Sequence, residues 1–199
     1  MKRKRQFTAR VLALLLAAVL LGGTVPLGVT AADTIAVSPT ALTTIVLADA
    51  CEAFGHIDGG EGQLYVETTL GDPYFDRVRP GDRIDLKVRV EKAGTYRWCV
   101  VSGWAKDAAN GTFRLFLDGE QITEPLANQV PGIDWRTWQD STPGTVKLPA
   151  GEHTLSLVTD TAGPNLYALK LAPEGVELSV PEGTVPLCEA DSNTPVQVY

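Results

Sequence analysis

The side chains of this sequence that could do acid–base or metal chemistry are few and do not form a recognisable catalytic set. His56 and His153 are the two histidines, and neither has a second His or a Cys at the spacing of a metal site. Neither G-x-S-x-G nor H-E-x-x-H occurs, and the glycines mark turns between strands rather than a phosphate-binding loop. We expect His153 to be structural, at the start of a strand, and His56 to be a solvated loop residue.

Carboxylates are the other candidates, because glycoside hydrolysis uses two of them on opposite sides of the scissile bond. We expect the acids in or near loops to be solvated rather than catalytic; they are Asp72, Asp76, Asp82 and Asp134. A chain of this length without an acid–base constellation is more typical of a binding protein. We therefore predict that it is not an enzyme, with a small hydrolase as the alternative.

Two tryptophans three residues apart form the most informative segment. Trp135 and Trp138 follow Pro131-Gly132 in a loop. If a strand begins at Trp135, its two-residue period puts the two indoles on opposite faces, so that one fills the core and the other stands in solvent. An exposed indole offers a flat apolar face that matches the C–H face of a sugar ring. The alternative, in which both indoles are core, remains open.

The elements that must position these residues are short β-strands separated by Gly, Pro, Asn and Asp. Residues 83–90 alternate strictly, which predicts a half-buried strand with its apolar side chains inward. Asn110-Gly111 and Asp118-Gly119 are typical hairpin turns. The expected strands are residues 43–48, 63–69, 83–90, 95–104, 112–117, 121–123, 145–148, 153–159 and 166–171. This pattern predicts an all-β, jelly-roll β-sandwich with a single domain.

The first 31 residues have the features of a secretory signal. A basic start precedes an apolar run of eleven residues at 11–21, which is too short to span a bilayer, and small residues follow before position 33. An uncleaved anchor is the alternative. We predict a signal peptide at 1–31, a leader at 32–42, the sandwich at 43–173 and a tail or linker at 174–199. The protein is then secreted or held in the cell envelope.

Removal of that segment makes the chain strongly acidic. Five of the 17 basic residues and none of the 24 acidic ones lie in the first 31 positions, so the remainder carries a net charge near −12. Such a surface repels phosphate backbones and anionic membranes, so we expect neither nucleic acid nor membrane as a partner. Cys51, Cys99 and Cys188 are an odd number, and a disulfide after export or buried free thiols are both open.

An ordered series of segments resembles carbohydrate-binding modules of families 6 and 35. The segments are G-D-R-I-D-L-K-V at 81–88, A-G-T-Y at 93–96, F-R-L-F-L-D-G at 113–119, W-R-T-W-Q at 135–139, L-P-A-G-E-H-T-L at 148–155 and P-N-L at 164–166. The resemblance covers about residues 46–172. It implies a galactose-binding-like sandwich with a sugar site in the loops at one end, and a polysaccharide or other glycan as the partner.

The resemblance also implies site residues. Such modules hold the sugar between two aromatic side chains, helped by an Asn just before the last strand. Trp135 matches the loop aromatic and Asn165 matches the Asn. The second aromatic is expected in the loop before Gly81, where we favour Tyr74, with Arg77 as the alternative at the aligned position.

A structural calcium is usual in these modules, and its acidic ligands come from the first strand and from an Asp in the last. Here Asp49 retains one acid, while Tyr167 stands where the Asp is expected. A hard cation needs several oxygen ligands. We therefore expect no cofactor, with a structural calcium at Asp49 as the alternative. The sequence predicts a secreted, non-catalytic glycan-binding module, or else a structural or adhesion β-sandwich of the cell envelope without a sugar site.

Overall fold

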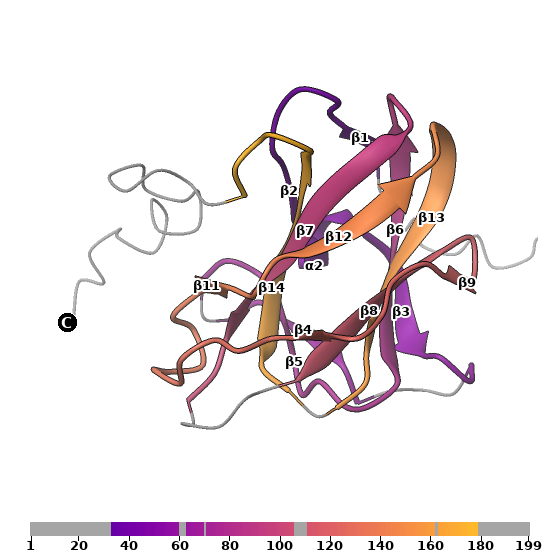
Figure 1. Ribbon diagram of the computed structural model, residues 1–199. Coiled ribbons are helices and arrows are strands. Elements are labelled where there is room, and N and C mark those ends of the chain that lie inside the picture. Colours follow the sequence, from indigo (N-terminus) through magenta and orange to yellow (C-terminus); the bar gives the residue numbers. More distant parts are fainter. Residues whose placement is uncertain (1–32, 60–62, 70, 106–110, 162, 179–199) are drawn as a thin grey trace, which may run out of the picture. The chain divides into compact units, whose positions relative to one another are not determined.

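The computed structural model describes residues 33–59, 63–69, 71–105, 111–161 and 163–178, and these residues form two seven-stranded β-sheets (Figure 1). The predicted all-β sandwich is confirmed. The predicted signal peptide, Cys188 and most of the predicted tail lie outside the described residues. No helix among the described residues is long and apolar enough to cross a membrane.

The first sheet has the strand order β1-β6-β13-β8-β10, with β3 added beside β6 and β9 beside β8. Its neighbours are antiparallel except β1, which runs parallel to β6. Its strands are β1 (Ile35–Val37), β3 (Cys51–His56), β6 (Asp82–Val90), β8 (Thr112–Leu117), β9 (Glu120–Gln121), β10 (Leu126–Ala127) and β13 (Gly151–Thr159).

The second sheet has the order β11-β7-β14-β5-β4, with β12 added beside β7 and β2 beside β14. A single helical turn, α2 (Leu47–Ala50), leads from β2 into β3 of the other sheet. The strands are β2 (Thr43–Val46), β4 (Tyr65–Glu67), β5 (Tyr74–Asp76), β7 (Gly94–Gly103), β11 (Gln139–Asp140), β12 (Gly144–Leu148) and β14 (Asn165–Pro173).

Alternating apolar side chains of the two sheets meet in one core. The alternation predicted for β6 is confirmed, since Ile84, Leu86, Val88 and Val90 are all buried in it. The same face of β7 contributes three further buried side chains, of which Trp98 is the largest. Each fully buried side chain of this kind contributes about 1.5–3 kcal/mol of hydrophobic free energy relative to an exposed one.

The sandwich extends beyond both predicted boundaries. Residues 35–37 were expected in a leader, but they form β1, which pairs with Val88–Val90 and buries Val37. At the other end Leu178 is buried against Cys99 and Ala172 on the outer face of the second sheet. Strand β1 is only three residues long, too short for its two-residue period to be distinguished from a loop.

The prediction for His56 is wrong, because this residue ends strand β3. Its Nδ1 lies 2.6 Å from a carboxylate oxygen of Asp58, and its Nε2 lies 3.1 Å from the Pro80 carbonyl oxygen. The ring packs so closely on Gly81 that a Cβ there would lie 2.4 Å from Nε2. A register irregularity at the start of β3 interrupts the alternation of apolar and polar side chains by which a strand is recognised in a sequence.

Cys51 and Cys99 are both free thiols. Burial raises the pKa of each to about 12, so neither is a thiolate at neutral pH. A disulfide and free thiols were the two alternatives, and Cys51 and Cys99 are free thiols.

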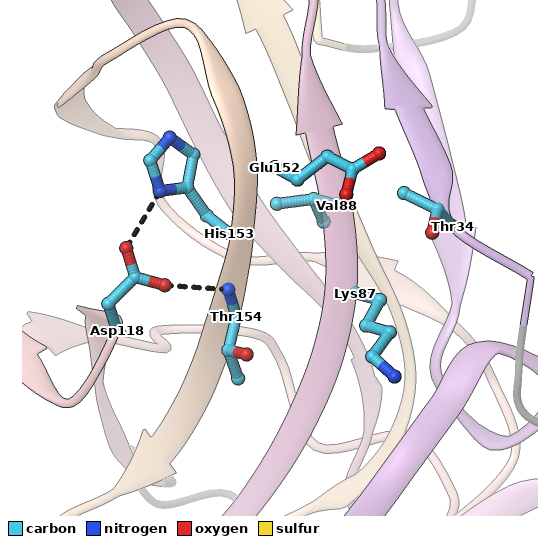
Figure 2. Close-up of a pocket in the computed structure, with 7 residues that line it drawn as sticks. All are labelled: Thr34, Lys87, Val88, Asp118, Glu152, His153 and Thr154. Atoms are coloured by element: carbon cyan, nitrogen blue, oxygen red, sulfur yellow. Dashed lines mark hydrogen bonds and ion pairs between the residues drawn. The ribbon is translucent and has the colours of Figure 1, made fainter.

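The hairpin at Asp118-Gly119 is a tight turn with both residues at positive φ, 51° and 89°. The Asp118 carboxylate accepts the Thr154 amide at 2.9 Å and lies 2.7 Å from His153 Nδ1 (Figure 2). These contacts tie the turn to β13 and give His153 a structural role. The hydrogen bond with His153, followed by that from Thr154, lowers the pKa of Asp118.

Replacing Asp118 by Asn tests this link, because Asn also tolerates positive φ but carries no charge. A carboxylate with a lowered pKa in the folded state stabilises the fold above its unfolded pKa of about 3.9 and loses that contribution as the pH falls. We expect Asp118→Asn to cost less than about 1 kcal/mol at pH 7, since the Asp118 side chain is 55% exposed. In urea unfolding the difference in free energy between the parent protein and the variant should shrink as the pH is lowered below the unfolded pKa of about 3.9. Glu120→Gln, on the same hairpin, is the control, and a difference that persists in acid would contradict the link.

Candidate functional site

A hollow of about 350 Å³ lies at the ends of β7 and β14. It brings together three of the four ligand-binding residues predicted from the sequence, which come from three different segments of the chain. The residues that line it are Asp76, Arg77, Val78, Arg79, Trp104, Trp135, Gly163 and Asn165.

Trp135 lies in a turn, so the strand that we considered as starting at this residue begins only at Gln139, as β11. The Asp134 carboxylate holds this turn by accepting the amides of Arg136 and Thr137 at 2.7 and 2.6 Å. It also accepts the Thr137 hydroxyl at 2.6 Å, and this bond is the main cause of the lowered pKa of Asp134. The backbone of the turn that carries the indole is therefore held by local hydrogen bonds.

The turn is fixed to the end of the second sheet by close backbone contacts. Asn165 Nδ2 donates to the Trp135 carbonyl oxygen at 3.1 Å, and the Ile133 amide donates to the Trp104 carbonyl at 2.9 Å. A Cβ at Gly103 would lie 2.6 Å from the same Trp135 oxygen. Only glycine at position 103 allows so close an approach of the two segments.

Two indoles meet at the hollow. The Trp135 side chain is exposed, with 40% of the residue accessible, and its ring is 4.7 Å from that of Trp104 at an interplanar angle of 78°. Trp104 was predicted only as the end of a strand. Its position directly after β7, at the end of the sheet where β14 begins, was the signal that could have identified it.

Tyr74 is not part of the hollow, so its prediction as the second stacking aromatic is wrong. It is 3% exposed and packs edge-on against Trp138 at 5.3 Å. Trp138 in turn stacks on Tyr167 at 5.0 Å. These rings belong to a small cluster apart from the main core, which also contains Val101. Trp135 is thus exposed and Trp138 is packed, so the alternative in which both indoles are core does not hold.

Arg77 lines the hollow in a left-handed backbone conformation, with φ of 57°. Its guanidinium lies over the Tyr65 ring, 5.3 Å from the centroid. The Tyr65 hydroxyl donates to Asp76 Oδ2 at 3.1 Å, which raises the pKa of Tyr65. Asp76 Oδ1 accepts the Arg77 amide. Asp76 therefore uses both oxygens to hold the segment that carries the arginine.

The described residues do not form the calcium site that was the alternative for Asp49. Asp49 lies in α2, exposed to solvent, and Tyr167 is buried against Trp138. Within the described ranges no three His, Cys, Asp or Glu side chains lie close enough together to hold a metal ion.

A second hollow, of about 200 Å³, lies over β6 and β13 and includes His153. Figure 2 shows the His153 ring turned toward Asp118 and the Glu152 carboxylate turned away from it, toward Thr34. Adjacent residues of a strand point to opposite sides, so these two side chains do not converge on a common point. This arrangement does not form an acid–base pair.

No family model and no curated protein matches this sequence. Solved structures do match. A family 35 carbohydrate-binding module from Clostridium thermocellum has a TM-score of 0.52 at 18% identity, covering 66% of this chain and 98% of that one. The C-terminal family 6 module of a marine laminarinase from Zobellia galactanivorans gives 0.50 at 17%, covering 66% and 98%. Another family 6 module gives 0.52 at 16%, covering 72% and 100%.

These likenesses establish the fold. The chain shares the β-sandwich of family 6 and family 35 carbohydrate-binding modules over nearly the whole length of each module. The resemblance inferred from the sequence segments is thereby confirmed at the level of the fold.

Replacing Gly103 by Ala tests the close contact between the end of β7 and the Trp135 turn. The new methyl group must displace the Trp135 backbone, and we expect a loss of about 1–3 kcal/mol in unfolding free energy. The Trp fluorescence should also shift, as the turn leaves Trp104. Gly94→Ala, at the other end of β7, is the matched control, because the nearest atom to its Cβ would be 3.9 Å away. Equal stability of both variants would refute the contact.

Proposed function

We propose that this chain is a secreted, non-catalytic carbohydrate-binding module, and that the sugar lies in the hollow lined by Trp135, Trp104 and Asn165. The observation that carries the proposal is an exposed indole, held by a rigid turn, beside a hollow with polar groups. An aromatic side chain at a hollow that also has a few polar groups is the usual composition of a ligand site. Export rests on the basic and apolar pattern of the first 31 residues.

The geometry suggests how a sugar ring is held. One face of the ring lies against the Trp135 indole through its C–H groups, while Trp104, at a steep angle to it, bounds the ring at the side. Asn165 and Arg77 offer hydrogen-bonding groups to hydroxyls at the same hollow. Affinity should be modest, because these few contacts must offset desolvation of many hydroxyl groups.

Two observations support binding without catalysis. Among the described residues that line the hollow, Asp76 is the single carboxylate, whereas glycoside hydrolysis needs a facing pair. Both oxygens of Asp76 also accept hydrogen bonds, from Tyr65 and from the Arg77 amide. The group is therefore committed to holding its own loop.

The alternative is a structural or adhesion domain of the envelope without a sugar site. That function would be favoured by a Trp135 ring buried beneath closed loops. The ring is instead 40% exposed beside an open hollow, which favours the binding module.

Trp135→Ala tests the proposal. We expect retention on an insoluble or gel-embedded polysaccharide to fall below detection, because the stacking face is lost. Stability should drop by only about 1–2 kcal/mol, since the ring is partly exposed and its main partner is one edge-on indole. Affinity electrophoresis over a panel of polysaccharides, with thermal unfolding in parallel, measures both quantities.

Phe54→Ala is the control, because Phe54 is also an exposed aromatic residue, 47% accessible, but does not line the hollow. It should bind like the parent protein. If Trp135→Ala retains full glycan binding, the sugar does not lie on this indole. If Trp135→Ala unfolds, the ring is a core residue and the assignment fails.

A further inference from the structure

We propose that His56 is a pH-sensitive support of the hollow: its doubly protonated ring holds the wall that contains Val78 and Arg79, and loss of one proton loosens that wall. The hollow then binds its ligand most tightly at mildly acidic pH. This inference rests on the proposed glycan-binding function and adds the regulation of the same site. The observation behind it is that both ring nitrogens of His56 face oxygen atoms that accept hydrogen bonds and donate none.

The turn at Pro80-Gly81 connects His56 to the hollow. Val78 and Arg79 line the hollow, and the turn follows them directly in the chain. His56 Nε2 lies 3.1 Å from the Pro80 carbonyl oxygen. Gly81, with φ of 82°, packs against the same ring, where any Cβ would clash with Nε2. The ring is therefore in direct contact with the segment that leaves the hollow wall.

The contacts of the His56 ring match its cationic form. Nδ1 lies 2.6 Å from Oδ1 of the Asp58 carboxylate, while Nε2 faces the Pro80 carbonyl. A neutral imidazole carries one N–H and can donate to only one of these oxygens, whereas the imidazolium donates to both. The Asp58 amide also approaches Nδ1, but at 3.4 Å this contact is much longer than that of the carboxylate.

Deprotonation should break the contact on the side of the hollow. A carboxylate is a stronger acceptor than a carbonyl, so the single proton of the neutral ring stays on Nδ1, facing Asp58. Nε2 of His56 then presents a lone pair to the Pro80 oxygen, and this contact becomes repulsive. The turn loses its hydrogen bond to β3, although Thr159 still donates to the Arg79 carbonyl at 2.5 Å. We therefore expect a loosened wall and not an unfolded one.

The charged groups around the ring favour the imidazolium. Among the described residues, Asp58 follows β3 directly, and Asp82 is paired opposite His56 at the start of β6. Arg79 is the cation of the turn, and its Nε donates to Gln63 Oε1 at 3.2 Å. The hydrogen bond with Asp58 is the main cause that raises the pKa of His56, and the nearby charge of Asp82 adds to it.

The direction of this shift fixes the direction of the pH dependence. A histidine with a raised pKa in the folded state makes its full contribution below its unfolded pKa of about 6.5. It loses that contribution as the pH rises through the folded pKa. The support of the wall is therefore complete in mild acid and lost in mild alkali.

Asp82 is the other titratable group that holds this turn. Its side chain is buried, which raises its pKa, and its Oδ2 accepts the Arg79 amide at 2.7 Å. Asp82 gains its proton as the pH falls, whereas the support by His56 is lost as the pH rises. The two groups are thus distinguished by the direction in which binding weakens.

The experiment measures binding of the purified protein to three neutral polysaccharides, laminarin, lichenan and dextran, by calorimetry at constant salt. Neutral polymers are used so that the ligand itself does not titrate. We expect the affinity for any polymer that binds to fall about threefold to tenfold from about pH 6 to about pH 8.5, because one partly exposed, charge-assisted hydrogen bond is lost.

Three variants assign the pH dependence to one residue. His56→Gln carries no titratable group, so its affinity should be constant over this range and close to that of the parent protein in alkali. Asp58→Asn removes the carboxylate that favours the imidazolium and should move the midpoint to lower pH. His153→Gln is the matched control, because the other histidine does not line this hollow, and it should leave the pH dependence unchanged.

A second measurement needs no ligand. Nitrogen-15 NMR of the imidazole should show both His56 nitrogens protonated in mild acid. The amide signals of Val78 and Arg79 should then shift with the same midpoint as the ring. If the ring titrates while these two amides stay unchanged, His56 does not support the wall. This measurement also decides the question if His56→Gln fails to fold.

The outcomes separate this inference from the proposed function. Glycan binding that is independent of pH, or a pH dependence that His56→Gln retains, overturns the role of His56 and leaves the binding module intact. A pH dependence removed equally by His153→Gln also overturns it. Coupled titration of the ring and the wall, without binding of any polysaccharide, supports the pH-sensitive support and counts against the glycan site.

Discussion

The hollow depends on the close approach of the Trp135 turn to the last residue of β7. The Trp135 carbonyl oxygen lies 2.6 Å from where a Cβ at position 103 would be, and it accepts a hydrogen bond from the buried Asn165 side chain. Asn165 is paired directly opposite Gly103 in the sheet. One missing side chain and one amide therefore determine how near Trp135 comes to Trp104.

The same loop is held at its far end on the outer face of the second sheet. Trp138 packs on Tyr74 and Tyr167. The buried Lys170 ammonium donates to both carboxylate oxygens of Asp140, at 2.7 and 2.9 Å. The loop is thus anchored on both sides of Trp135. The indole is exposed, while the backbone of its turn is held by the hydrogen bonds to Asp134.

The regular strands of this fold were predictable because their side chains alternate. Strand β8 spans residues 112–117 as expected, and the inward faces of β6 and β7 are those that the pattern indicated. The short or irregular strands β1, β3 and β5 could not be predicted in this way. β1 and β5 have three residues each, and β3 contains a register irregularity, so none of them shows a period that can be recognised.

The sequence by itself determined the class of fold, the tight turn at Asp118-Gly119 and the loop that carries Trp135, because these depend on local pattern and residue type. Only the tertiary structure decided which residues share the hollow. It placed Trp104 and Arg79 there and removed Tyr74, which lies on the other side of its strand from Phe75 and packs under Trp138. Residues distant in sequence meet at one site only when the sheets pair and the loops dock, and no local pattern records that meeting.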